Sequence, residues 1–166
     1  MKTEECSNCG RMASVVRSSY RFDEMGLPLV LDGIEIVKCS ACGNEDPIIP
    51  KLDDLMHSIA FGIIACPRKL CGAEVRFLRK YVGQTQKEFA QLIHTDHTHL
   101  CNVETGRENI GDQSDKLVRL VVLNLSPDLR DKIDEIMAAL PDMEDTPCSG
   151  KPLIHFNPTT RQMQYA

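Results

Sequence analysis

The spacing of hydrophobic residues changes along the chain from a strand pattern to a helix pattern. Residues 15–22 and 27–39 are strand-like, and Asp32-Gly33 inside the second stretch favours a turn between two strands. From residue 50 to residue 65, apolar residues recur at i, i+3 and i+4. This pattern predicts a helix that ends before Pro67.

Residues 72–125 contain four short helical patterns separated by tight turns. The first covers about residues 73–81. Thr85 and Glu88 have the spacing of a capping box, which predicts that the second helix begins at Gln86. We therefore expect a compact group of short helices in this part of the chain.

The third of these helices has an apolar face and a polar face. The sequence predicts a turn at His94-Thr95, an N-cap at Asp96 and a terminating glycine at Gly106. At 100° per residue, Leu100 and Val103 share one face of the helix. The residues predicted on the opposite side are Thr98, Cys101, Asn102 and Thr105.

The C-terminal part continues with one more predicted helix, over residues 128–140 after Pro127. Its apolar positions are expected on one face and are Leu129, Ile133, Ile136, Met137 and Leu140. Residues 141–152 have the composition of a linker. The remaining tail predicts a small hairpin that turns at Asn157-Pro158.

The composition is that of a folded protein with no general basic character. Apolar residues make up 42% of the chain and the formal net charge is −5. Charge is uneven, however, with nine basic against seven acidic residues over residues 66–125, so this segment is expected to bind DNA if any does. The polar N-terminal residues do not resemble a secretory signal, and the longest apolar run is too short to span a bilayer. We expect a cytoplasmic protein with reduced thiols and no membrane partner.

Two CxxCG motifs, which contain Cys6, Cys9, Cys39 and Cys42, are the strongest chemical signal in the sequence. Two residues between cysteines let both sulfur atoms reach one ion, and the glycine allows a turn with positive φ. Four thiolates form a closed tetrahedral site, so we predict one structural Zn²⁺ per chain. A redox CxxC and cysteines without any metal are the alternatives. Catalytic zinc is disfavoured because four thiolates leave no position for water.

Other cysteines and histidines offer weaker signals. A second metal site involving Cys66, Cys71, Cys101 or the residues of the His94–His99 run stays open, and Cys148 is isolated. Small buried thiols and a polar surface that contains histidines are the commoner explanations. We see no nucleophile–base arrangement and no phosphate-binding loop, and we predict no catalytic residues and no enzymatic activity.

The polar side of the third helix suits the major groove of DNA. Asn102 could contact adenine through two hydrogen bonds, and the methyl group of Thr98 could contact a thymine methyl. The start of the second helix, with Lys87 beside it, could receive a phosphate. The predicted DNA-binding residues are Gln86, Lys87, His97, Thr98, Cys101, Asn102, Thr105 and Arg107.

Residues 85–106 resemble the helix-turn-helix of the Xre-type repressors. The two CxxCG motifs followed by this segment are similar to the MqsA-type (YgiT-type zinc finger) antitoxins, over about residues 4–125. The resemblance implies zinc on the four cysteines and homodimers on a palindromic operator. It also implies an N-terminal module that contacts a toxin protein. His94-Thr95 departs from the family, in which a glycine and an apolar residue are usual, and this departure predicts a strained turn.

The resulting fold prediction is mainly α, with a small β-containing N-terminal zinc module and a C-terminal helix-turn-helix domain of the Xre or λ-repressor type. The predicted segments are a zinc module at 1–48, a connecting helix and linker at 49–70, a DNA-binding domain at 71–140 and a tail at 141–166. The predicted function is a repressor that is the antitoxin of a toxin–antitoxin system and regulates its own operon. A regulator without a toxin, and a protein-interaction scaffold that does not bind DNA, are the alternatives.

Overall fold

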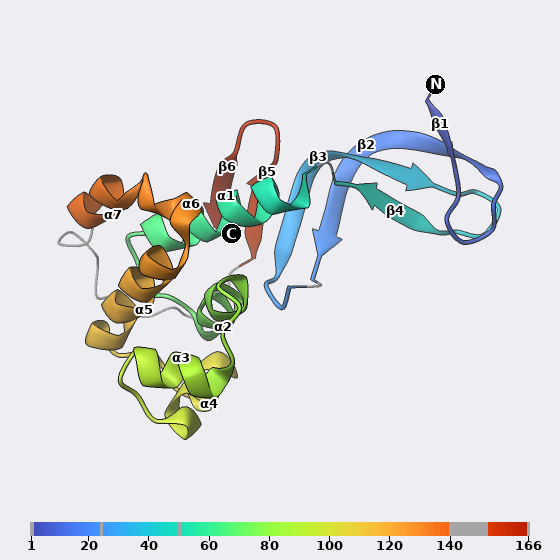
Figure 1. The fold of residues 1–166 in the computed structure, drawn as a ribbon. Helices are drawn as coiled ribbons and strands as arrows, with labels where there is room; N and C mark the ends of the chain where they lie inside the picture. Colours follow the sequence, from blue (N-terminus) through green and yellow to red (C-terminus); the bar gives the residue numbers. More distant parts are fainter. Residues whose placement is uncertain (1, 24, 50, 140–152, 166) are drawn as a thin grey trace. The chain divides into compact units, whose positions relative to one another are not determined.

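The computed structural model describes residues 2–23, 25–49, 51–139 and 153–165, and it divides into two compact units. The first, called the sheet unit below, comprises residues 1–23, 28–55 and 153–166. The second, called the helical unit, comprises residues 24–27 and 56–152. Each unit is described by itself (Figure 1). The predicted linker, Leu140 and Cys148 lie outside the described residues.

The sheet unit contains one mixed sheet in which β3 is the central strand. The strands are β1 (Thr3–Glu5), β2 (Met12–Phe22), β3 (Leu29–Lys38), β4 (Glu45–Ile48), β5 (Ile154–Asn157) and β6 (Gln162–Tyr165). Their order is β1-β2-β3-β5-β6, and β4 also pairs with β3. The β3–β5 pair is parallel, and the other pairs are antiparallel. The predicted C-terminal hairpin is therefore present, and its first strand is part of the same sheet as the N-terminal strands.

Gly33 lies inside β3 and not in a turn between two strands. The register between β2 and β3 shifts between Ser18 and Tyr20, where one residue of β2 opposes two of β3, Asp32 and Gly33. Gly33 has a φ of 72°, which glycine adopts without steric cost. The turn expected at Asp32-Gly33 is thus wrong: the pair forms a β-bulge, because the hydrogen-bonded ladder continues on both sides of it.

The fold is mixed α/β, which corrects the prediction of a mainly α protein. The sheet has its own buried side chains, including Leu29, Leu31 and Ile36 of β3 with Ile154 and Phe156 of β5. These five side chains are at most 1% exposed. The β content was underestimated because residues distant in sequence, on β3 and β5, complete one sheet.

The helical unit contains α1 without its first turn. Among the described residues it also contains six further helices. The bounds are α1 (Leu52–Ala65), α2 (Gly72–Tyr81), α3 (Gln86–Leu92), α4 (His97–Glu104), α5 (Asp112–Leu125), α6 (Pro127–Arg130) and α7 (Ile133–Ala139). The four helices expected within residues 72–125 are confirmed as α2 to α5. Helix α2 packs closely on α4, since a Cβ atom at Gly72 would lie 1.8 Å from the carbonyl oxygen of Val103.

The single helix predicted over residues 128–140 is divided into α6 and α7. Leu129 and Ile136 are buried, whereas Ile133 and Met137 are 42% and 47% exposed. The expected common apolar face is therefore wrong for Ile133 and Met137. The helical hydrogen-bonding pattern is interrupted at residues 131–132, which form a turn. Within the described ranges, every helix is too short or too polar to cross a lipid bilayer.

Candidate functional site

The two CxxCG motifs form matching turns at one end of the sheet. The N–H groups of Gly10 and Gly43 donate to the carbonyl oxygens of Cys6 and Cys39, each at 2.9 Å. These glycines have φ values of 69° and 75°, in the left-handed region that the turn requires. The first turn connects β1 to β2, and the second connects β3 to β4. Antiparallel pairing of the strands therefore brings two motifs 30 residues apart to the same place.

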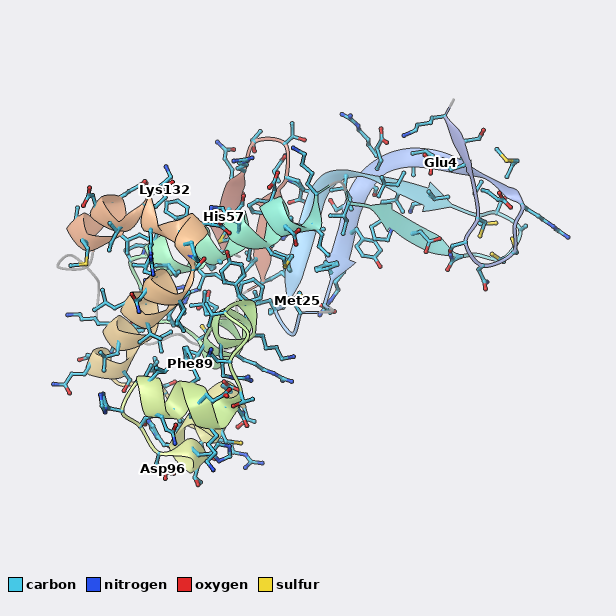
Figure 2. All side chains as sticks on the ribbon, in the orientation of Figure 1. Glu4, Met25, His57, Phe89, Asp96 and Lys132 are labelled. Carbon is cyan, nitrogen blue, oxygen red and sulfur yellow. The ribbon has the colours of Figure 1, made fainter. Side chains whose placement is uncertain are left out.

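The four cysteine sulfur atoms face a common centre. The Sγ atoms of Cys6 and Cys42 lie 3.6 Å apart, as do those of Cys9 and Cys39. All four sulfur atoms lie within 4.8 Å of one another. A tetrahedral ion with metal–sulfur bonds of about 2.3 Å requires sulfur atoms about 3.8 Å apart. The cluster can therefore hold a metal ion. Figure 2 shows sulfur atoms gathered at this end of the sheet, near the labelled Glu4.

Backbone N–H groups at the two turns favour the thiolate form of the first cysteine of each motif. The N–H of Cys9 lowers the pKa of Cys6, and the N–H of Cys42 lowers the pKa of Cys39 to about 6. The N–H of Arg11 lowers the pKa of Cys9, but the sulfur of Cys39, burial and the sulfurs of Cys42 and Cys6 together outweigh it and raise this pKa to about 12. Four negative charges this close repel one another, so a bound cation is what allows all four thiols to ionise.

A small set of interactions supports the cluster. Cys6 and Cys39 are buried with Ala13 and Val37 in a minor core, against which Val15 and Ile48 also pack. Asn44 donates through Nδ2 to Asp46 at 2.8 Å and to Ser7 Oγ at 3.2 Å, which connects the two turns. This end of the sheet buries few apolar side chains. A metal ion bound there would replace much of the missing core.

The segment of α3, a short turn and α4 carries the second candidate site. The capping box at Thr85 and Glu88 is confirmed, and α3 begins at Gln86 as predicted. Asp96, labelled in Figure 2, accepts from the N–H groups of Thr98 at 2.7 Å and His99 at 3.4 Å, so the expected N-cap of α4 is also confirmed. The turn between the helices contains His94 in the left-handed region, with a φ of 50°.

The buried side of α4 combines apolar packing with an ion pair. Leu100 and Val103 are at most 2% exposed. Glu104, beside them, receives Nε and Nη2 of Arg79 at 2.6 and 3.0 Å. Gln86 donates through Nε2 to the same carboxylate at 2.7 Å. Gln86, predicted to lie against DNA, thus has its side-chain amide directed toward this ion pair.

The opposite side of α4 is polar. His97, Thr98 and Thr105 are exposed, and Cys101 and Asn102 are half-buried. Asn102 donates through Nδ2 to Glu108 at 2.7 Å, and His99 Nδ1 lies 2.6 Å from the other oxygen of this carboxylate. The amide of Asn102 and, second, His99 hold the pKa of Glu108 below its usual range. The sequence analysis did not identify Glu108, because nothing in the local pattern connects it to α4.

An open hollow of about 580 Å³ lies alongside α4. The eight residues that line it are Arg76, Arg79, Thr85, Gln86, Lys87, His97, Glu104 and Thr105. Four of the predicted DNA-binding residues are therefore brought together here. Thr98, Cys101, Asn102 and Arg107 are not among the lining residues. Arg76, an exposed residue of α2, was not predicted from the sequence, because its place in the hollow depends on how α2 packs against α3 and α4.

The second metal site left open by the sequence finds no support among the described residues. The four-cysteine cluster is the one group there with three or more metal-ligating side chains close together. Cys66 and Cys101 are free thiols outside it, and Cys71 is disulfide-bonded, so its sulfur is not a free ligand. Within the described part of the chain, His94, His97 and His99 form no such group.

The comparisons with known proteins identify no relative. No family model, no curated protein and no solved structure matches this chain. The four-cysteine cluster and the α3–α4 segment are therefore the features that indicate function.

Proposed function

We propose that this chain is a zinc-containing, sequence-specific DNA-binding repressor, in which α3 and α4 form a helix-turn-helix. The observation that carries the proposal is α4, which is N-capped by Asp96, buried through Leu100 and Val103, and polar on its other side. Its eight residues extend about 12 Å, and the width of the major groove is about 12 Å. A short helix held from behind by another helix is the common way to present side chains to base edges.

Thr98 and Asn102 are the proposed base-reading residues. Both are on the polar side of α4, and the exposed Thr98 could place its methyl group against a thymine methyl. One Nδ2 hydrogen of Asn102 is used by Glu108. The second Nδ2 hydrogen and Oδ1 remain for N7 and N6 of adenine. The hydrogen bond to Glu108 therefore orients the amide for this contact.

Zinc is the metal that we propose for the four-cysteine cluster. Four thiolates in a tetrahedral set suit Zn²⁺ and leave no open position, which supports a structural site. The expected role of the ion is to stabilise the two turns and thereby the end of the sheet. A cytoplasmic location, where the four free thiols of the cluster stay reduced, belongs to this proposal; Cys71, outside the cluster, is disulfide-bonded.

The antitoxin role is the proposal for the partner. Residues 1–52 contain six basic against eight acidic residues, and four thiolates with one Zn²⁺ add a charge of −2. Such a surface repels DNA and attracts a basic partner such as an RNA-cleaving toxin. Residues 16–22 of β2 pair with β3 alone among the described strands, which leaves an edge for β-strand addition. Homodimers on a palindromic operator complete the proposal.

Selection from a random duplex library tests the DNA-binding function. We expect the wild-type chain to select a palindromic sequence with half-sites about 34 Å apart. Asn102→Ala should cost about 1–3 kcal/mol in binding and relax the preference at one base per half-site. Asn124→Ala, an exposed asparagine on α5, is the matched control and should retain the wild-type preference.

The outcome also separates the alternative functions. If the wild-type chain bound no duplex DNA, the remaining function would be a protein-interaction scaffold that does not bind DNA. Unchanged preference in Asn102→Ala would exclude Asn102 as a reader. Calorimetry of the full chain with the product of the neighbouring gene tests the antitoxin role, and no binding there would leave a regulator without a toxin.

A further inference from the structure

Two cations of the hollow beside α4 have no charge partner within the part of the chain that the structure describes. Arg76 of α2 and Lys87 of α3 both line the hollow, and both are exposed. Neither forms an ion pair or a side-chain hydrogen bond with any described residue. Their charges are therefore available to a ligand.

The carboxylate in the hollow does not cancel these charges. Glu104 is 6% exposed and is already bound by Arg79 at 2.6 and 3.0 Å and by Gln86 at 2.7 Å. Arg79 and Glu104 neutralise each other, so Arg76 and Lys87 leave the hollow with net positive charge. The hollow is therefore suited to an anion.

The position of the hollow indicates which anion it receives. Its lining includes His97 at the first residue of α4 and Thr105 at the C-cap, so it extends along the whole helix. A helix that enters a groove of DNA has a sugar-phosphate backbone beside it. The backbone would then lie next to Arg76 and Lys87.

We propose that this hollow binds a phosphate of the DNA backbone and that Arg76 is a backbone-contacting residue. The proposal rests on the DNA-binding function proposed above and adds a residue on α2 that the sequence did not indicate. The planar guanidinium of Arg76 can donate two parallel hydrogen bonds to one phosphate, and Lys87 supplies a second charge from α3. These contacts fix the position of α4 without reading sequence.

Lys80 provides a matched comparison with Arg76. Both are exposed cations on α2, four residues apart, but Lys80 is not among the residues that line the hollow. Like charges at this spacing mildly destabilise a helix, so the pair contributes nothing favourable to folding. Replacing either residue by glutamine removes one positive charge from the same helix.

The experiment measures binding of the full-length chain to a labelled 30-base-pair duplex of random sequence by fluorescence anisotropy, from 50 to 200 mM KCl. Arg76→Gln should weaken binding about tenfold and reduce the slope of log K against log salt by about one. Arg76→Lys should recover the slope but only part of the affinity. Lys80→Gln should retain the wild-type slope. Thermal unfolding should change little in all three variants, because both residues are exposed and loss of one like-charge pair has only a mild effect on a helix.

Several results would overturn the proposal. Equal losses in Arg76→Gln and Lys80→Gln would mean that only net charge matters. If Arg76→Gln left the slope of log K against log salt unchanged, while Asn102→Ala lost the preference for a DNA sequence, the phosphate site would be excluded and the DNA-binding function would stand. If the wild-type chain bound no duplex, both proposals would fall. If potassium phosphate at equal ionic strength displaced the duplex from wild type more than from Arg76→Gln, the hollow would be assigned to a free phosphate.

Discussion

His94 occupies a backbone conformation that glycine adopts more easily. Its φ of 50° is in the left-handed region, and its side chain is exposed, so packing does not compensate for the strain. Its N–H donates to the carbonyl oxygen of Gln91 at 3.2 Å, a hydrogen bond that any residue can make. The side chain therefore has a steric cost, and it forms no hydrogen bond or ion pair with the described residues that would compensate for it.

We predict that His94→Gly raises the free energy of unfolding of the helical unit by about 0.5–1 kcal/mol. His94→Ala, which keeps a Cβ atom in the same conformation, should give no such gain. Urea unfolding followed by circular dichroism at 222 nm measures both. A gain for alanine as large as that for glycine would show that strain at this position is not the cause.

The boundaries of short helices were predictable where capping residues define them. Thr85 with Glu88 and Asp96 indicated the starts of α3 and α4 because a cap acts within three residues of its own position. The two cysteines of each motif were predictable as a pair for the same reason, since their spacing lets both sulfur atoms reach one ion. Arg76 and Glu108 were not, because their roles depend on which helices pack together. The break between α6 and α7 likewise had no sequence signal that we recognised.

We expect the stability of the two cysteine turns to depend on a bound metal ion. Purified wild-type chain, kept reduced, should contain one zinc ion, and Cys39→Ser should contain almost none. Hydrogen exchange should then increase in the strand ends next to the turns, where Val37 pairs with Asp46, and not in the helical unit. Cys101→Ser removes a free thiol outside the cluster and should retain the metal. Wild-type protein without metal, or a metal-loaded Cys39→Ser, would contradict the site.

Arg119 connects α5 to the chain segment that follows α1. Its guanidinium is fully buried and donates to the carbonyl oxygens of Ile64 at 2.6 Å, Cys66 at 2.7 Å and Arg68 at 2.7 Å. It also donates to Asp115 at 2.9 Å. One side chain thus satisfies carbonyl groups at and beyond the C-terminal end of α1, where a positive charge is favourable.

Arg119→Met should lower the free energy of unfolding by about 3–5 kcal/mol, because it leaves Asp115 as a buried charge without its cation. Asp115 also accepts from the N–H of Leu70 at 2.7 Å, and this single bond cannot replace the lost ion pair. The same substitution at Arg130, which is exposed, should cost much less. Chemical denaturation of the two variants makes the comparison, and similar losses would contradict the proposed role of Arg119.

At the scale of the whole molecule, the sheet unit is completed by a strand from the far end of the sequence. Leu29 pairs with Ile154 and Leu31 with Phe156 in parallel, and His155 Nδ1 lies 2.9 Å from Asp32 Oδ2. Local patterns indicated the hairpin at residues 153–165, but they contain no information about which strand it joins. For this reason the sequence predicted a small N-terminal module and a separate tail, where the structure has one sheet.

This pairing predicts that the sheet unit depends on residues 153–165 for stability. Phe156 is 1% exposed, so Phe156→Ala should lower the free energy of unfolding of the sheet unit by about 3–5 kcal/mol through lost burial and a cavity. Met163, its partner on β6, is only half-buried, and Met163→Ala should cost less than about 1 kcal/mol.

Hydrogen exchange measured by mass spectrometry can follow the two units separately in one protein. Exchange in β2 and β3 should increase in Phe156→Ala, while α2 to α5 should keep their protection, because they belong to the helical unit and the hairpin belongs to the sheet unit. If β3 kept its wild-type protection from exchange in Phe156→Ala, the hairpin would not be required for the stability of the sheet. Loss of protection throughout both units would show that they do not unfold separately.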